Sequence, residues 1–425
     1  MFTTELIAEI KKGTYDQLIN DIYVDVTKLE YQKQRYINAI KSYAKEFGDD
    51  DVSIFSAPGR SEIGGNHTDH QHGQIIAASI NNDAIAITKP LTEAVVKVIS
   101  DGYDMITVSL DSLELVEDEK ETTIALIKGV LAKLKDNGHA IGGFQAYITS
   151  DVLIGAGLSS SAAYETLIGS IISGLYNDMR ISSVEIAKVG QYAENVYFGK
   201  PCGLMDQMAC SVGNLVYVDF ANPSEPVVEK IDFDMNQYGY SLCITDTKGS
   251  HADLTADYAA VPQEMKMVAA CFDQDVLLGI SSEDVINNIV DLRNKVGDRG
   301  VLRAMHFISE NERVGFEVTA LKSGDINGFL KLVSDSGNSS YKYLQNVYSN
   351  SDVHHQNVSL ALCVSEITLG SNGVCRVHGG GFAGTIQAFV KNEAVSEYQK
   401  TMNKVFGDGA CSVLKIRKYG GMKVL

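Results

Sequence analysis

Residues 153–165, Leu-Ile-Gly-Ala-Gly-Leu-Ser-Ser-Ser-Ala-Ala-Tyr-Glu, constrain the fold of this chain more than any other segment. Alternating apolar residues over 144–149 predict a strand before this segment, and apolar residues three and four apart over 162–176 predict a helix after it. Where a strand, a glycine loop and a helix follow in this order, backbone N–H groups and the helix dipole converge on an anion. The segment therefore predicts either an anion-binding loop or a small-residue turn that packs a helix closely against a sheet.

The residue types of this loop suit a phosphate group. Gly155 and Gly157 allow the backbone to come close to a ligand, and Ser159, Ser160 and Ser161 add hydroxyls for phosphate oxygens or Mg²⁺. Neither Gly-Lys-Ser nor Gly-Lys-Thr follows the glycines, so the loop is not a Walker loop.

Length and charge limit the classes of protein that fit. A chain of 425 residues is long for one core, which predicts two domains, 1–222 and 223–425. The net charge of −18, from 36 Lys+Arg and 54 Asp+Glu, disfavours DNA and RNA as partners, because their affinity comes from neutralised phosphates. A nucleotide still fits, because it needs only a local site.

The sequence also predicts where the protein works. No apolar segment is long enough to span a bilayer, and residues 1–13 lack the apolar core of a secretion signal. The seven cysteines form no Cys-x-x-Cys pair, which disfavours a disulfide framework or a zinc ribbon. We therefore expect a cytoplasmic protein with reduced thiols and no membrane partner.

Hydrophobic periodicity predicts a mixture of helices and strands, which is typical of an α+β fold. In the first half we expect a helical lead-in over 1–48, strands over 52–57, 84–88, 95–100, 105–110 and 144–149, and helices over 121–135, 162–176 and from 182 to 199. After these we expect strands over 215–220 and 240–245 and two or three helices between 261 and 348. The chain should end with a strand over 386–390, a helix over 392–406 and a strand over 413–416. A turn is expected at 58–60, where Pro, Gly and Arg end the first strand.

The polar segment 61–73 lies between two predicted strands and allows three interpretations. His67, Asp69, His70 and His72 suggest a metal site, but their spacing fits no standard zinc motif. A solvated hairpin loop is a second interpretation. A site that hydrogen-bonds a polyol is the third, and it fits the polarity best.

Two acidic residues need an explanation. Asp206 lies among apolar and small residues, where an acid is costly to bury unless it is paired or functional, and a helix N-cap is the simpler alternative. Glu194 lies near the end of a predicted helix, where it is either a ligand or a solvated surface acid.

Three separated motifs resemble the signature motifs of the GHMP small-molecule kinases. They are Ala-Pro-Gly-Arg (57–60) continuing to Gly-Asn-His-Thr-Asp-His (65–70), Gly-Ala-Gly-Leu-Ser-Ser-Ser-Ala (155–162) and Gly-Gly-Gly-Phe-Ala-Gly (379–384). Within that superfamily the chain most resembles the galactokinases, with further matches at 141–144, 193–195, 202–207, 251–258 and 302–314. The resemblance covers about residue 50 to the end.

The resemblance implies a fold and an activity. The N-terminal domain, 1–222, is then of the ribosomal-protein-S5 type, the C-terminal domain, 223–425, is ferredoxin-like, and the active site lies between them. The implied reaction is the phosphorylation of galactose at its anomeric hydroxyl, with ATP and Mg²⁺ as cofactors. Both a monomer and a dimer agree with the sequence.

The resemblance also implies roles for individual residues. Asp206 matches the catalytic aspartate, as a base or an orienting group, and Arg60 matches the arginine that pairs with it. The triphosphate loop matches Gly155, Ala156, Gly157, Leu158, Ser159, Ser160 and Ser161, the Mg²⁺ ligands match Ser161 (or Ser160) and Glu194, and the sugar contacts match Asn66, His67, Asp69, Gly203 and Tyr258.

One departure from the family bears on the substrate. The family motif Asn-Leu-Ile-Gly-Glu-His-Thr-Asp-Tyr reads Glu-Ile-Gly-Gly-Asn-His-Thr-Asp-His over 62–70, so Asn66 replaces the glutamate that accepts a hydrogen bond from the sugar's 6-hydroxyl. Asn66 with a cationic His70 or His72 predicts a uronic acid such as galacturonate. We favour the simpler hypothesis that Asn66 still binds the 6-hydroxyl of galactose. Leu153, His378 and Ala383 are milder departures from the family.

Two other functions remain as alternatives. A sugar-binding regulator of the same fold is one, although Asp206, Arg60, the serines and Glu194 are all present. A mevalonate-type kinase is the other, and the segment 302–314 disfavours it.

Overall fold

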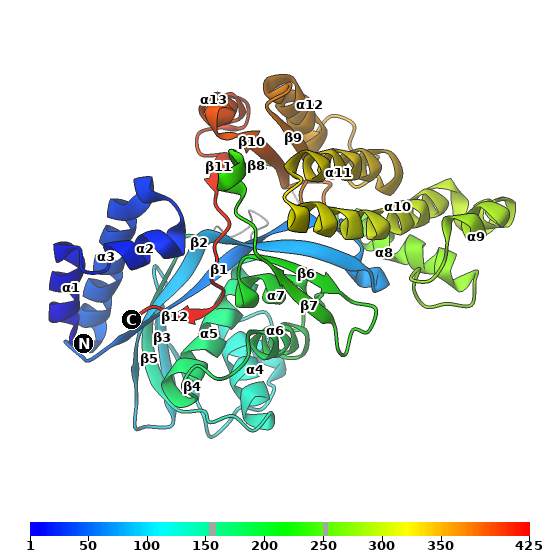
Figure 1. Cartoon of the computed structure of the whole chain (residues 1–425). Helices are drawn as coiled ribbons and strands as arrows, with labels where there is room; N and C mark the ends of the chain where they lie inside the picture. Colours follow the sequence, from blue (N-terminus) through cyan, green and yellow to red (C-terminus); the bar gives the residue numbers. More distant parts are fainter. Residues whose placement is uncertain (153–158, 250–253) are drawn as a thin grey trace.

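Two β-sheets and the helices that cover them make up the protein (Figure 1). The computed structural model describes residues 1–152, 159–249 and 254–425. Within these ranges the first sheet has eight strands: β1 (Ser53–Gly64), β2 (Gln74–Pro90), β3 (Val95–Ser100), β4 (Ile106–Ser109), β5 (Phe144–Ser150), β6 (Leu215–Asp219), β7 (Val227–Ile231) and β12 (Met422–Lys423). The second has four: β8 (Tyr240–Asp246), β9 (Gly373–Val377), β10 (Thr385–Lys391) and β11 (Cys411–Leu414).

Helices cover both faces of the first sheet because its strands alternate between two apolar faces. Ile54 and Ile87 pack on one face with the lead-in helices α1 (Thr3–Lys12), α2 (Asp16–Tyr23) and α3 (Leu29–Phe47). Their neighbours Phe55 and Ala86 pack on the other face with the second group of helices. That group consists of α4 (Thr123–Asp136), α5 (Ser160–Tyr176) and α6 (Ser183–Tyr192), while α7 (Met205–Val212) packs against Ile75 and Ala77 of β2. The predicted lead-in helices are therefore confirmed.

The turn expected at residues 58–60 is wrong. β1 continues through these residues and stays paired with β2, with a register shift between Pro58 and Arg60. Across this shift β1 advances from Pro58 to Arg60 while β2 runs from Asp83 to Ser79, so the extra residues lie in β2 and β1 continues without ending.

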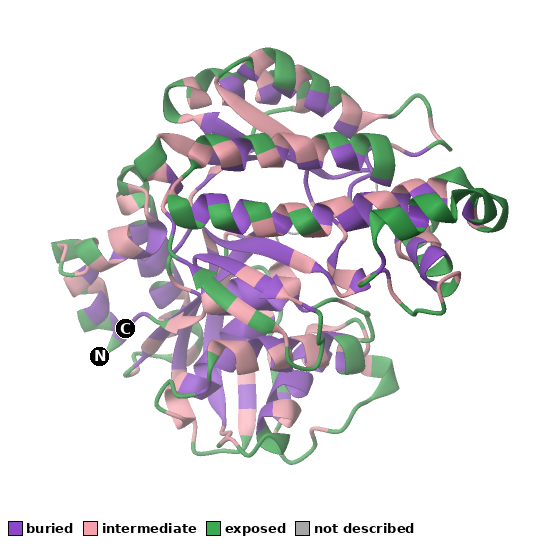
Figure 2. Cartoon of the chain, turned by 45° about the vertical axis from the view of Figure 1, so that its right-hand side comes forward, coloured by how far each residue is buried: buried purple, intermediate pink, exposed green. Residues whose placement is uncertain are grey.

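The second sheet is antiparallel, with strand order β11-β8-β10-β9. The helices α10 (Ile289–Ser323) and α11 (Ile326–Ser339) lie between the two sheets, and one apolar core joins them to both. The helices α12 (Asn357–Leu369) and α13 (Val395–Phe406) cover the other face. Figure 2 shows mostly buried strands beneath helices that alternate between buried and exposed residues. These layers agree with the α+β fold that we expected.

The expected two or three helices between residues 261 and 348 are too few. The segment holds α8 (Thr255–Ala270), α9 (Ser282–Asn287), α10 and α11. Periodicity missed the division because α9 has only six residues and Gly297 interrupts α10 with a positive φ. Over the described part of the chain, no helix combines the length and the apolar character that crossing a membrane requires.

Two strands of the first sheet come from beyond residue 222. β7 pairs with β6, and β12 pairs with β1 after the chain has completed the second sheet. The division into 1–222 and 223–425 therefore stays a prediction about domains, while the first sheet takes strands from both segments.

A buried carboxylate ties three distant segments together. Asp83 on β2 accepts hydrogen bonds from Arg35 Nη1 at 2.6 Å, from Arg417 Nη1 at 2.9 Å and from the Tyr23 hydroxyl at 2.9 Å. Burial raises the pKa of Asp83, but the charges of Arg35 and Arg417 lower it more, so that the net pKa lies below its ordinary value. Asp83 thus joins the lead-in helices, the sheet and the C-terminal segment.

We predict that Asp83→Asn lowers the free energy of unfolding by about 3–5 kcal/mol, because it removes the carboxylate that pairs with buried Arg417 and leaves buried Arg35 with Asp151 as its remaining carboxylate partner. Urea unfolding at neutral pH measures the loss. The native pKa of Asp83 lies below the unfolded value of about 3.9. The stability that this carboxylate gives the wild type is therefore lost as the pH drops below about 4. The Asp83→Asn variant should not show this loss of stability at acidic pH. Asp298→Asn, which breaks the exposed pair with Arg293, is the control and should change little. Equal losses in the two variants would contradict the prediction.

Candidate active site

Four segments of the chain enclose a polar cavity of about 350 Å³. They are β1, the loop after it, the start of α7 and the glycine turn between β9 and β10. The lining residues are Arg60, Glu62, His67, Asp69, His70, Cys202, Gly203, Met205, Asp206, Gly379 and Gly380. Five of the residues predicted for catalysis or sugar binding therefore meet in one cavity: Arg60, His67, Asp69, Gly203 and Asp206.

Arg60 and Asp206 form a two-pronged ion pair in this cavity. Arg60 Nε donates to Asp206 Oδ1 at 2.6 Å, and Arg60 Nη2 donates to Oδ2 at 2.7 Å. The Ser159 hydroxyl also donates to Asp206 Oδ2. Asp206 lies in the first turn of α7, after the N-cap Leu204, so it is not the cap that the simpler interpretation required.

The ion pair keeps Asp206 ionised. Burial raises the pKa of Asp206, but the charge and hydrogen bonds of Arg60 and the Ser159 hydroxyl lower it below its ordinary value. The Asp206 side chain is still 30% exposed, so a ligand in the cavity can reach it. The site thus offers a carboxylate that is charged at neutral pH beside a fixed guanidinium.

The loop after β1 gives the cavity two imidazoles, from His67 and His70, and the carboxylate of Asp69. His67 Nε2 lies 3.2 Å from the Gly380 carbonyl oxygen, and His67 Nδ1 lies 3.2 Å from His70 Nε2. A Cβ at position 203 would lie 2.6 Å from Asp69 Oδ2, so a larger residue there would displace that carboxylate. Burial, with the charge of His67, lowers the pKa of His70 to about 3, so His70 is neutral and the expectation of a cationic His70 is wrong.

Asn66 lies behind the cavity and not in its wall. Its side chain is fully buried, with Nδ2 donating to Glu62 Oε1 at 3.1 Å and to the Gly379 carbonyl at 2.8 Å. Its Oδ1 accepts from Ser340 Oγ at 3.1 Å and from Asn346 Nδ2 at 3.0 Å. Every hydrogen-bonding group of this side chain has a protein partner. Direct contact between Asn66 and a sugar stays a prediction, which these contacts do not favour.

Tyr258 packs against the glycine turn from outside the cavity wall. Its hydroxyl donates to the Gly381 carbonyl at 2.7 Å, and a Cβ at position 380 would lie 2.9 Å from its ring. Contact between Tyr258 and a sugar also stays a prediction.

His378 fastens the same glycine turn to β1. The Glu62 backbone N–H donates to His378 Nε2 at 3.3 Å, so Nε2 is unprotonated, and Nδ1 can donate to Thr385 Oγ1 at 2.9 Å. Burial and the charges of Arg60 and Arg376 lower the pKa of His378 to about 3, which keeps this imidazole neutral. The unusual histidine at this position therefore holds the two sheets together.

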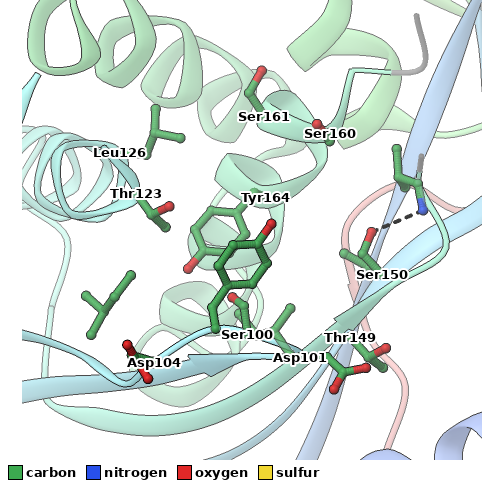
Figure 3. Close-up of a pocket in the computed structure, with 15 residues that line it drawn as sticks. Ser100, Asp101, Asp104, Thr123, Leu126, Thr149, Ser150, Ser160, Ser161 and Tyr164 are labelled. Atoms are coloured by element: carbon green, nitrogen blue, oxygen red, sulfur yellow. Dashed lines mark hydrogen bonds between the residues drawn. The ribbon is translucent and has the colours of Figure 1, made fainter. Parts of the chain in front are cut away.

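A second cavity, of about 610 Å³, opens at the N-terminus of α5 (Figure 3). Ser160, Ser161 and Tyr164 reach it from α5, and Thr123 and Leu126 reach it from α4. Across from them lie Ser100, Asp101 and Asp104, next to β3 and β4. Two of the three predicted loop serines, Ser160 and Ser161, therefore face a space large enough for a small molecule.

Part of the predicted phosphate loop cannot be compared with this geometry. Gly155, Ala156, Gly157 and Leu158 lie outside the described residues. Ser159, the first described residue after them, has a positive φ of 53° and precedes the first turn of α5.

Ser161 and Glu194 form an oxygen-rich pair beside this second cavity. The Ser161 hydroxyl donates to Glu194 Oε1 at 3.1 Å, and Gln207 Nε2 donates to Glu194 Oε2 at 2.9 Å. Nearby, Glu165 Oε1 is buried and has no hydrogen-bond partner among the described residues. A hydroxyl and a carboxylate suit Mg²⁺, which takes one or two carboxylates and completes its shell with water and phosphates. The two predicted metal ligands thus lie together and fit the ion.

The sequence interpretation missed several lining residues. Glu62 follows Arg60 by two positions in a strand, and residues two apart in a strand lie on the same face. This spacing could have predicted that Glu62 lines the same cavity as Arg60. Met205, Gly379 and Tyr164 lie within the segments 202–207, 379–384 and 153–165 that the sequence analysis singled out, but no pattern in the sequence showed that these side chains line a cavity.

The chain is similar in sequence to known galactokinases. The family model for the GHMP kinases N-terminal domain matches residues 125–214, and the galactokinase galactose-binding signature matches residues 41–90. A galactokinase of Streptomyces coelicolor is 29% identical over 367 residues, 85% of this chain and 90% of that protein. One of Limosilactobacillus reuteri is 28% identical over 389 residues, 88% of this chain and 94% of that protein.

Solved structures share the fold. Lactococcus lactis galactokinase complexed with galactose superimposes with a TM-score of 0.75 at 24% identity, covering 90% of this chain and 98% of that one. A mevalonate kinase superimposes with a TM-score of 0.59 at 18% identity, covering 86% and 99%. The chain has the GHMP kinase fold.

We predict that Arg60→Gln raises the pKa of Asp206, because burial then acts on this carboxylate without the opposing charge. A carboxyl ¹³C NMR titration measures the shift, with Asp206→Asn to assign the signal. Protonation of Asp206 should occur at higher pH in the variant than in the wild type. Arg293→Gln, which removes an exposed arginine, is the control and should leave the signal unchanged. An unshifted Asp206 signal in Arg60→Gln would contradict the assignment of Arg60 as its counter-charge.

Proposed function

We propose that this chain, which has the GHMP kinase fold and carries the galactokinase galactose-binding signature, acts as a sugar 1-kinase of the galactokinase type. It transfers the terminal phosphoryl group of ATP to the anomeric hydroxyl of galactose and forms galactose 1-phosphate. The observation that carries the proposal is the Arg60–Asp206 pair in a polar cavity close to the serine-bearing start of α5.

Asp206 and Arg60 divide the chemistry between them. Ionised Asp206 accepts a hydrogen bond from the anomeric hydroxyl and orients it or takes its proton. Arg60 keeps Asp206 ionised and stabilises negative charge on the transferring phosphoryl group. Phosphoryl transfer asks a protein mainly for positioning and charge neutralisation, which this pair supplies.

The second cavity suits the nucleotide. Its volume and its mixture of apolar and hydroxyl groups fit a nucleoside, and the start of α5 directs N–H groups and the helix dipole toward phosphates. Ser161 and Glu194 would hold Mg²⁺, and the bound ion would neutralise charge on the triphosphate. Ser159 and Ser160 contribute hydroxyls beside it.

The charges of the sugar cavity support a neutral substrate. Three carboxylates line it, from Glu62, Asp69 and Asp206, against two guanidinium groups: Arg60 in the lining, and Arg376, which pairs with Glu62 from behind the wall. A sugar acid such as galacturonate would bring a further negative charge, and neutral His70 does not offset it. The same repulsion disfavours mevalonate. Galactose is therefore preferred to the uronic acid hypothesis, and the intact catalytic pair disfavours a regulator without activity.

We also infer a cytoplasmic location, where ATP is supplied and thiols stay reduced. The support is that all seven cysteines are free.

The proposal is tested by ATP turnover with Mg²⁺ in parallel on galactose, galacturonate, glucose and N-acetylgalactosamine. We expect galactose to give the highest kcat/KM and galacturonate to give turnover close to the background. Faster turnover of galacturonate would contradict the charge argument. Binding of galactose without turnover of any sugar would favour the regulator.

We predict that Asp206→Asn lowers kcat by about 10²–10⁴-fold, the range for removing a general base. Galactose binding, measured by calorimetry, should weaken far less, because the amide keeps the shape and one acceptor oxygen. Asp298→Asn, an exposed aspartate on α10, serves as the matched control. Unchanged kcat in Asp206→Asn would remove Asp206 from the mechanism.

A further inference from the structure

Glu62 and Arg60 point from β1 into the same cavity. Between them the strand is regular, with Arg60, Ser61 and Glu62 opposite Ser79, Ala78 and Ala77 of β2. Residues two apart in a strand share a face and lie about 7 Å apart. Both side chains line the cavity. A hexose whose reacting hydroxyl lies beside Asp206 and Arg60 would therefore bring its far end to Glu62.

One oxygen of the Glu62 carboxylate is fixed, and the other is available. Oε1 accepts hydrogen bonds from Asn66 Nδ2 at 3.1 Å and from the Arg376 guanidinium. Arg376 is almost completely buried, so it balances the charge of Glu62 from behind the cavity wall. Oε2 accepts no hydrogen bond from the residues that the structure describes, and it is not among the buried oxygens that lack a partner. This oxygen therefore remains for a ligand in the cavity.

The sequence of this segment exchanges two side chains. The family motif has asparagine where this chain has Glu62, and glutamate where it has Asn66. In this chain both side chains are buried, but the Asn66 amide has all its groups bonded to protein, whereas the Glu62 carboxylate lines the cavity. Relative to the family motif, the carboxylate and the amide have exchanged positions in the sequence. In this chain the two side chains are hydrogen-bonded to each other.

We propose that Glu62 binds the sugar in this chain, accepting a hydrogen bond on Oε2 from a hydroxyl on the C4–C6 side of the ring, and that Asn66 is a positioning residue for Glu62. The proposal rests on the function proposed above and names a determinant of its sugar specificity.

The surroundings make this contact selective. The Glu62 side chain is only 6% exposed, so a hydrogen bond to it is shielded from water and the loss of its partner is costly. Its negative charge accepts hydroxyl donors and repels a carboxylate at the same place on the ring. Asn66 and Arg376 hold Oε1, which sets the direction of Oε2 before the sugar arrives.

Deoxy sugars test the contact without any mutation. The wild-type protein is assayed for kcat/KM with galactose and with its 2-deoxy, 4-deoxy and 6-deoxy derivatives. We expect the 4-deoxy or the 6-deoxy sugar to lose at least about tenfold, the effect of one hydrogen bond to a charged group. If both sugars react as well as galactose, no hydroxyl on that side of the ring binds a carboxylate, and the proposal is overturned.

Glu62→Gln then assigns the loss to its residue. The variant should raise KM for galactose much more than it lowers kcat, and it should remove most of the penalty for the sensitive deoxy sugar. Glu397→Gln, the same change on the outer helix α13, should leave the whole pattern unchanged. If Glu62→Gln keeps both the wild-type KM and the wild-type deoxy penalty, Glu62 is not the acceptor, although galactose turnover still supports the proposed function.

Asn66 is tested by restoring the family order. Asn66→Glu alone places two carboxylates side by side and should impair galactose binding, whereas Glu62→Asn together with Asn66→Glu should regain much of it. Recovery in the double variant with a full deoxy penalty supports the pair as one unit. Failure of the double variant to recover, when thermal melting shows that it is folded, would overturn the positioning role of Asn66. Absence of turnover by the wild type on every sugar would overturn both the inference and the function on which it rests.

Discussion

The ladder between β1 and β2 fixes the geometry of the molecule. Side chains alternate along these strands, so a shift of one residue would exchange the faces of the sheet. On the lower part of β1, Ile54 faces the lead-in helices and Phe55 faces the second group of helices. Beyond the register shift after Pro58, the same strand turns Arg60 and Glu62 toward the polar cavity. One pair of strands thus carries two apolar cores and the polar groups of the site.

Polar contacts between the two sheets hold the cavity in shape. Arg376 and His378 belong to β9 and the turn after it, and both reach β1, at the Glu62 carboxylate and the Glu62 N–H. Asn66 is held by Ser340 and Asn346, from the segment after α11. Since buried polar groups without partners are costly, these contacts favour one relative position of the two sheets. The back of the cavity is therefore rigid, while its front remains open to ligands.

Much of the fold and the site could be predicted from the sequence, because the information was local. The lead-in helices follow from apolar spacing, and the meeting of Arg60, Asp69 and Asp206 follows from family motifs. The orientation of Asn66 could not be predicted, because its partners Ser340 and Asn346 are far away in the sequence. The register shift after Pro58 was hidden for a similar reason, since only pairing with β2 keeps that segment extended.

The return of the chain to its first sheet affects how the protein is made. The first sheet gains its last strand, β12, only after the second sheet is complete, and Arg417 reaches Asp83 at the same stage. During synthesis, Asp83 and Arg35 are made before Arg417. The backbone of Ile54 is likewise made before Val424 and Leu425, with which it hydrogen-bonds in the complete protein. A chain still held by the ribosome, or released early, therefore exposes the unpaired edge of β1 to other chains. This edge is the place where we would expect a chaperone to be needed most.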